Sequence, residues 1–160
     1  MKSVVIYYSY SGNTKKVAQM LTELLAQKGE VQQTELVGLD ESKSFFGQCR
    51  RAFLRKRATL QPVNLDLSRY DLICLGTPVW AFGPTPAINT YLDKCFGLEG
   101  KNVILFTTYG SGTGNERCLK FMQDILAKKG AKQFSRFSIQ QFKVNDKDFV
   151  ISAVKKALSP

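Results

Sequence analysis

Short apolar runs rich in β-prone residues alternate along this chain with longer segments in which apolar residues recur at helical spacing. The expected strands cover residues 4–8, 31–37, 72–75, 102–108 and 131–140. The first is apolar throughout, as expected for a strand buried on both faces of a sheet. Because strands separated by helices assemble as right-handed βαβ units, the alternation predicts an α/β fold with an open, doubly wound parallel sheet.

The expected helices follow the first, third, fourth and fifth strands, and capping residues mark several of their ends. Thr85 and Pro86 form a favourable N-cap and N1 pair. Asn115 and Asn145 are placed at the starts of the two later helices, and Gly29 just beyond the end of the first. The residues expected to face inward are Val17, Leu21, Leu24, Leu25, Ile88, Leu92, Cys95, Phe96, Cys118, Leu119, Met122, Ile125, Leu126, Phe149, Val150, Ala153, Val154 and Leu158.

The chain has 160 residues and 44% apolar content, so we expect a single globular domain over residues 1–160. Its apolar runs are much shorter than the roughly 20 residues that a membrane-spanning helix needs. The N-terminal apolar stretch is also too short for a secretory leader, and no small-residue cleavage site follows it. We therefore expect a cytoplasmic protein without a membrane span.

The chain has no histidine and four widely spaced cysteines. The lack of histidine excludes Ser-His-Asp and Cys-His catalysis and argues against a metal site, because imidazole is the commonest ligand. The cysteines form no CxxC pair, which favours reduced thiols. Cys74, Cys95 and Cys118 are expected to be packing residues. Cys49 precedes two arginines that could stabilise its thiolate, although an inert thiol is the simpler interpretation.

The formal net charge is +10, and segment 43–57 carries six basic residues and no acidic one. A basic face favours acidic partners, phosphates or nucleic acid, although such faces are commonly just solvated. Phenylalanines interleave the segment, either as the buried side of an amphipathic helix or as a stacking surface for bases. The charge alone leaves the class of partner open.

Three unusual loops follow the first, third and fourth expected strands, at residues 9–14, 77–84 and 107–115. In a doubly wound sheet, ligands bind beyond the carboxyl ends of the strands, where the strand order reverses. All three loops lie at that edge. Their coincidence predicts one ligand site built from three separate segments.

The first loop suits a phosphate group. Ser9, Ser11 and Thr14 offer hydroxyl donors, and Gly12 lets the backbone approach closely. The following helix has no acid in its first turn, so its N–H groups are available to an anion. The loop lacks the spacing of a Walker loop, and by itself it would more simply be a turn with an N-cap.

The other two loops carry aromatic side chains and glycines. Trp80, the only tryptophan, lies with Phe82 between two prolines, and Tyr109 opens the glycine-rich third loop. Each feature alone has a structural explanation. A loop tryptophan commonly packs in the core, and a glycine-rich loop is often only a flexible connection. Together the three loops predict a site for a ligand with a phosphate at one end and a planar heterocycle at the other. Aromatic side chains would face the heterocycle, and backbone groups would hydrogen-bond to its rim.

Over essentially its whole length the chain resembles the flavodoxin family. Residues 9–14 match that family's [ST]-x-[ST]-G-x-T phosphate loop, Trp80 lies where the family has its first flavin-stacking aromatic residue, and Tyr109 is a match to the second. The resemblance implies a flavodoxin-like five-stranded sheet of order 2-1-3-4-5, an order that belongs to the family, with helices on both faces and bound FMN. The fifth-strand region carries no long insertion, which is typical of short-chain members.

The resemblance implies a set of cofactor-binding residues and no catalytic or metal-ligating side chain, because the flavin itself carries the chemistry. The residues implied to bind FMN are Ser9, Tyr10, Ser11, Gly12, Asn13, Thr14, Pro78, Val79, Trp80, Ala81, Phe82, Gly83, Thr108, Tyr109, Gly110, Gly112 and Thr113. Lys15 and Lys16 follow the loop but are expected to face solvent.

Two features depart from the family. Short-chain flavodoxins typically have glycine after the stacking tryptophan, whereas this chain has Ala81, for which a left-handed backbone costs about 1–2 kcal/mol. Flavodoxins are also usually acidic, and this chain is basic.

The sequence favours an FMN-binding redox protein that transfers electrons through the flavin. One alternative is an NAD(P)H-dependent reductase of FMN or a quinone, in which segment 43–57 meets the nucleotide's phosphates, although no second nucleotide motif is present. Another is a flavin-free basic module that binds RNA or an acidic protein. The expected partner is an acidic redox protein or NAD(P)H, and nucleic acid is not expected.

Overall fold

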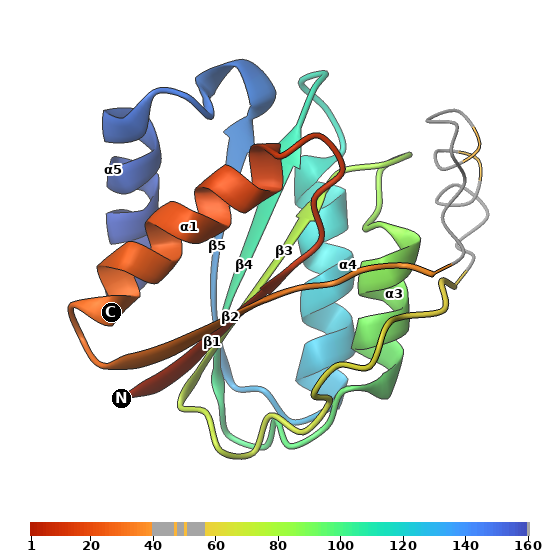
Figure 1. Cartoon of the computed structure of the whole chain (residues 1–160), viewed down its shortest axis with the longest axis vertical. Coiled ribbons are helices and arrows are strands. Elements are labelled where there is room, and N and C mark those ends of the chain that lie inside the picture. Colours follow the sequence, from red (N-terminus) through yellow and green to blue (C-terminus); the bar gives the residue numbers. More distant parts are fainter. Residues whose placement is uncertain (40–46, 48–49, 51–56, 160) are drawn as a thin grey trace.

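The computed structural model describes residues 1–39, 47, 50 and 57–159. Within them, parallel strands form one sheet in the order β2-β1-β3-β4-β5, which confirms the expected order (Figure 1). The elements are β1 (Lys2–Tyr7), α1 (Asn13–Ala26), β2 (Glu30–Glu35), β3 (Leu72–Pro78), α3 (Pro86–Lys94), β4 (Asn102–Tyr109), α4 (Asn115–Lys128), β5 (Gln133–Gln140), the 3-10 turn η1 (Gln141–Lys143) and α5 (Lys147–Leu158).

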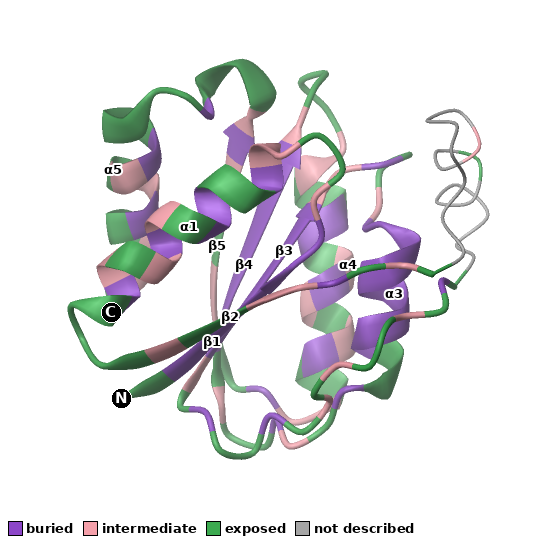
Figure 2. Ribbon diagram, viewed as in Figure 1, coloured by how far each residue is buried: buried purple, intermediate pink, exposed green. Residues whose placement is uncertain are grey.

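The sheet is a middle layer with α1 and α5 on one face and α3 and α4 on the other (Figure 1). Each face has its own apolar cluster, and the inward sides of the helices are buried (Figure 2). Leu21 and Val154 pack in the first cluster, and Leu92 and Leu119 in the second. Strand β1, between β2 and β3, is buried from its second residue onward, as its apolar run predicts.

A glycine in β3 makes room for an aromatic ring from β4. Gly76 pairs with Phe106, and a Cβ added at Gly76 would lie 2.1 Å from Phe106 Cζ. The Phe106 ring stacks on Phe137 of β5, with centroids 5.5 Å apart and planes 10° apart. A side chain at residue 76 would therefore displace the ring.

The described cysteines are packing residues, as expected. Cys74, Cys95 and Cys118 are buried free thiols. Burial raises the pKa of all three, and that of Cys95 to about 11. They are therefore protonated at neutral pH. The predictions made for Cys49 and for most of segment 43–57 lie outside the described residues.

Several expected boundaries are corrected. β3 does not stop at Leu75 but continues to Pro78, because its last residues pair with β4. The N-cap of α4 is Gly114 rather than Asn115, and α5 begins at Lys147 after the N-cap Asp146.

Two phenylalanines expected to face inward are exposed instead. Phe96 is 56% exposed because α3 ends at Lys94, which breaks the helical spacing that would turn its ring inward. Phe149 is 46% exposed, and its ring lies 5.7 Å from Lys143 Nζ. No described helix is long and apolar enough to cross a membrane.

Candidate functional site

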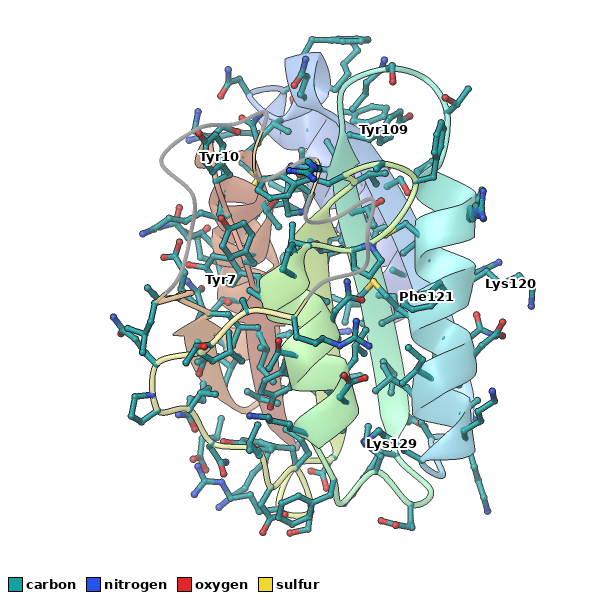
Figure 3. The ribbon with its side chains drawn as sticks, turned by 90° about the vertical axis from the view of Figure 1, so that its right-hand side faces the viewer. Tyr7, Tyr10, Tyr109, Lys120, Phe121 and Lys129 are labelled. Carbon is teal, nitrogen blue, oxygen red and sulfur yellow. The ribbon has the colours of Figure 1, made fainter. Side chains whose placement is uncertain are left out.

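The three loops expected to form a site meet at the carboxyl edge of the sheet. The hydroxyls of Thr14 and Thr108 join the first and third loops through a buried hydrogen bond of 2.8 Å. The rings of Tyr10 and Trp80, with centroids 5.6 Å apart, join the first and second. Tyr10 and Tyr109 lie toward the same end of the sheet (Figure 3).

The first loop ends at a helix start whose N-cap residue is a glycine. Gly12 is the N-cap of α1 at φ 85°, where L side chains are strained, and it has no side chain of its own to cap the helix. The first turn has no acidic residue. The Lys15 N–H donates to Ser9 Oγ at 3.2 Å, and a Cβ added at Gly12 would meet no atom within 4 Å. Open space beside Gly12, at the positive end of a helix dipole, suits an anion.

The two lysines that follow are held away from this loop by other elements. Lys15 Nζ lies 2.9 Å from Glu35 Oε2 on β2, and the hydrogen bond to Glu35 raises the pKa of Lys15. Lys16 Nζ donates to Asn145 Oδ1 at 2.8 Å. Among residues 9–16, the groups left to an anion are therefore hydroxyls and backbone amides.

A strained turn forms the second loop. Trp80 and Gly83 exchange backbone hydrogen bonds of 2.9 and 3.0 Å. The two residues between them have positive φ, 46° at Ala81 and 65° at Phe82, which is the pattern of a type I′ turn. Non-glycine residues adopt this backbone at a cost of about 1–2 kcal/mol each. The left-handed conformation considered for Ala81 is thus present, and Phe82 shares it.

The two aromatic residues of this turn have different surroundings. Trp80 is only 6% exposed, and the rings of Tyr8 and Tyr10 approach it edge-on at 5.8 and 5.6 Å. Phe82 is 52% exposed and lies against Gly114, where an added Cβ would come within 2.6 Å of Phe82 Cδ1. The turn therefore buries the ring of Trp80 and leaves the ring of Phe82 exposed.

A pocket of about 240 Å³ opens between the second and third loops. It is lined by Val79, Ala81, Phe82, Tyr109, Gly110, Ser111 and Thr113. All of these except Ser111 were expected from the sequence, and Ser111 lies within the same glycine-rich loop. Ligand pockets usually measure about 300–1,000 Å³, so this one has room for a ring system rather than for a whole nucleotide.

The remaining expected residues lie around this pocket without lining it. Pro78 ends β3, and the Val79 N–H donates to the Thr108 carbonyl at 2.8 Å. Gly83 closes the strained turn, and Gly112 is exposed at the tip of the third loop. Residues 9–14 lead into the start of α1, and Tyr10 among them contacts Trp80.

The structure also brings in a residue that the sequence did not indicate. Gln140 at the end of β5 donates from Nε2 to the Gly110 carbonyl at 3.0 Å. A glutamine at the end of an edge strand has no distinguishing sequence signal. Its contact ties the third loop to the fifth strand.

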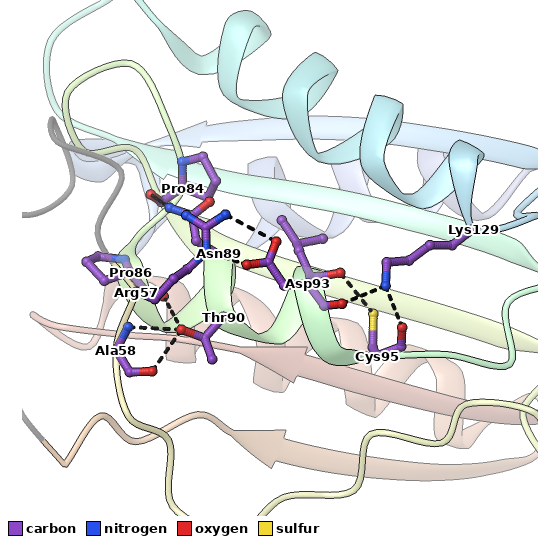
Figure 4. Close-up of polar contacts among 10 residues, drawn as sticks. Arg57, Ala58, Pro84, Pro86, Asn89, Thr90, Asp93, Cys95 and Lys129 are labelled. Atoms are coloured by element: carbon purple, nitrogen blue, oxygen red, sulfur yellow. Dashed lines mark hydrogen bonds and ion pairs between the residues drawn. The ribbon is translucent and has the colours of Figure 1, made fainter.

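Helix α3 anchors the far end of the second loop (Figure 4). Thr90 Oγ1 accepts from the Ala58 N–H at 2.9 Å, and Asn89 Nδ2 donates to the Pro84 carbonyl at 3.2 Å. Lys129 Nζ donates to two carbonyls at the end of α3, each at 2.8 Å. The Asn89–Pro84 bond ties the second loop to α3, and the other contacts join α3 to the segment before β3 and to the end of α4.

The site can supply hydrogen-bond donors and aromatic faces but little acid–base chemistry. No carboxylate, lysine or arginine is among the described residues that line the pocket. The described residues also hold no group of three side chains able to bind a metal ion.

Solved structures similar to this chain are flavoproteins of low sequence identity. A flavoprotein in complex with FMN from Lactobacillus acidophilus NCFM has a TM-score of 0.66 at 22% identity, covering 92% of this chain and 98% of that one. Oxidised flavodoxin 1 from Bacillus cereus has a TM-score of 0.65 at 19% identity, covering 99% and 100%. An NADH:FMN oxidoreductase in its apo form has a TM-score of 0.65 at 17% identity, covering 98% and 88%.

The comparison with curated proteins gives no match. A family model described as flavodoxin matches residues 2–140. That span includes all three loops of the carboxyl edge and the five strands that carry them, and the chain therefore belongs to the flavodoxin family.

Proposed function

We propose that this protein binds FMN at the carboxyl edge of its sheet and transfers electrons through it. The observation that carries the proposal is a helix start with a glycine N-cap and no acidic residue in its first turn, joined by the Thr14–Thr108 hydrogen bond to the loop of a pocket lined by aromatic residues. Membership of the flavodoxin family and the FMN complex of the similar Lactobacillus flavoprotein support it.

The residues fit the two ends of such a cofactor. The loop of residues 9–14 would hold the phosphate through hydroxyls and backbone amides, since Lys15 and Lys16 are engaged with Glu35 and Asn145. The pocket between the second and third loops would hold the ring, with backbone groups of residues 110–113 at its rim. Pro78, Gly83 and Thr108 would position these loops.

FMN, when bound, supplies the electron-transfer chemistry. The protein's own residues would bind and orient it, and the side chains of Val79, Phe82 and Tyr109 in the pocket lining would cover part of the ring. No carboxylate or lysine lines the described pocket, so the proposal assigns no side chain as a general acid or base.

We further propose an electron-carrier role with an acidic redox partner, which the net charge of +10 supports. Rapid anaerobic mixing of the FMN-loaded protein with NADPH or NADH tests this role. A carrier leaves the flavin absorbance unchanged. Rapid bleaching would instead identify an NAD(P)H-dependent reductase.

The phosphate assignment is tested by measuring FMN and riboflavin affinity for the wild type and for Ser11→Ala. Ser11 is exposed beside the helix start, so its removal should leave the fold intact. Loss of one hydrogen bond to a charged group, worth about 1.5–3 kcal/mol, should weaken FMN binding about tenfold or more. Riboflavin has no phosphate, and its affinity should not change.

Ser152→Ala is the matched control, because Ser152 is an exposed serine on α5. It should bind both flavins as the wild type does. Equal weakening of FMN and riboflavin by Ser11→Ala would contradict a phosphate site at this loop.

A further inference from the structure

We propose that Phe82, rather than Trp80, is the aromatic residue that faces the flavin ring on the β3 side of the pocket, with Tyr109 contributing from the β4 side. This inference rests on the proposed function and names the residue that determines affinity for the ring system. The observation behind it is the opposite placement of two aromatic side chains within one four-residue turn.

The Trp80 side chain packs inside the protein. Its side chain is 6% exposed and belongs to the apolar cluster on the α3–α4 face of the sheet. Tyr8 and Tyr10 meet its ring edge-on, with interplanar angles of 81° and 76°. Trp80 is not among the residues that line the pocket.

Phe82 has the exposure and position that Trp80 lacks. It is 52% exposed and lines the pocket directly, together with Tyr109. An exposed ring at the wall of a pocket loses apolar contact with water when a flat ligand covers it, which favours binding. Phe82 therefore has apolar surface to offer a ligand.

The backbone fixes this position. Phe82 lies at φ 65°, inside a turn closed by both hydrogen bonds between Trp80 and Gly83. A strained conformation retained beside a pocket is the kind of outlier that accompanies ligand binding. Gly114 has no side chain, and this leaves room for the Phe82 ring. A Cβ at residue 114 would come within 2.6 Å of Phe82 Cδ1.

Affinities of FMN and riboflavin for Phe82→Leu, Phe82→Tyr and Trp80→Phe test the inference. Phe82→Leu keeps apolar bulk but removes the aromatic face, so both flavins should bind about tenfold more weakly. Phe82→Tyr should retain the affinity of the wild type. Trp80→Phe keeps an aromatic ring in the core and should bind both flavins within about twofold of the wild type.

Phe142→Leu is the matched control, since Phe142 is a 67% exposed phenylalanine in η1 that does not line the pocket. Its flavin affinities should equal those of the wild type. Weakening by Trp80→Phe with no effect of Phe82→Leu would overturn this inference and leave the proposed function standing. Failure of the wild type itself to bind FMN would overturn both.

Discussion

At the scale of single residues, the turn from Trp80 to Gly83 shows what a sequence pattern can and cannot predict. The pattern located the loop and identified Ala81 as a departure from glycine. It did not indicate that Phe82 shares the left-handed backbone, because that depends on which residues close the turn. The hydrogen bonds between Trp80 and Gly83 place Ala81 and Phe82 at the two positions where φ must be positive.

Ala81→Gly should raise the free energy of unfolding of the flavin-free protein by about 1 kcal/mol, because glycine adopts positive φ without steric cost. Chemical denaturation measures the change. Ala127→Gly, at an exposed position in α4, is the control and should lower the same quantity by about 0.5–1 kcal/mol. An Ala81→Gly protein less stable than the wild type would show that the turn is not strained.

At the scale of elements, periodicity predicted which helices and strands exist but not where each ends. β3 passes through Gly76, Thr77 and Pro78, although Gly-Thr-Pro is a typical strand breaker. Pairing with β4 overrides the local preference, and it brings the second loop to the same edge as the third. Helix α3 then holds that loop through the Asn89–Pro84 bond and the segment before β3 through the Thr90–Ala58 bond, and no local pattern indicates either contact.

Thr90→Val should destabilise the protein by about 1–3 kcal/mol, because the buried N–H of Ala58 would lose its acceptor. Thr90→Ser keeps the hydroxyl and is the matched control, with a smaller loss that reflects only the missing methyl group. Denaturant titration of both variants gives the comparison. Equal losses would mean that the hydroxyl does not hold the segment before β3 against α3.

At the scale of the whole molecule, parallel topology explains why the location of the site could be predicted from sequence. Because the strands are parallel, the loops after β1, β3 and β4 lie at one edge of the sheet. The strand order makes these three strands neighbours. The orientations of Trp80 and Phe82 could not be predicted in the same way, since they follow from contacts with Tyr8, Tyr10 and Gly114. Those contacts join segments distant in the chain.

A hollow of about 580 Å³ at the opposite, amino-terminal edge offers a direct contrast to the proposed site. Its lining includes Lys28, Asp71 and Asn102, at the starts of strands and the end of α1. It is larger than the pocket at the carboxyl edge. Its lining includes neither the start of α1 nor the turn that presents Phe82.

The most direct test is a titration of the ¹⁵N-labelled protein with FMN, followed by amide chemical shifts. The proposed site predicts large changes at Gly12, Thr14 and Gly110, at the helix start and in the third loop, with saturation at one FMN per chain. The amides of Lys28 and Asn102 should remain unchanged. Changes centred on those two residues, or none at the carboxyl edge, would contradict the assignment of the flavin to this edge of the sheet.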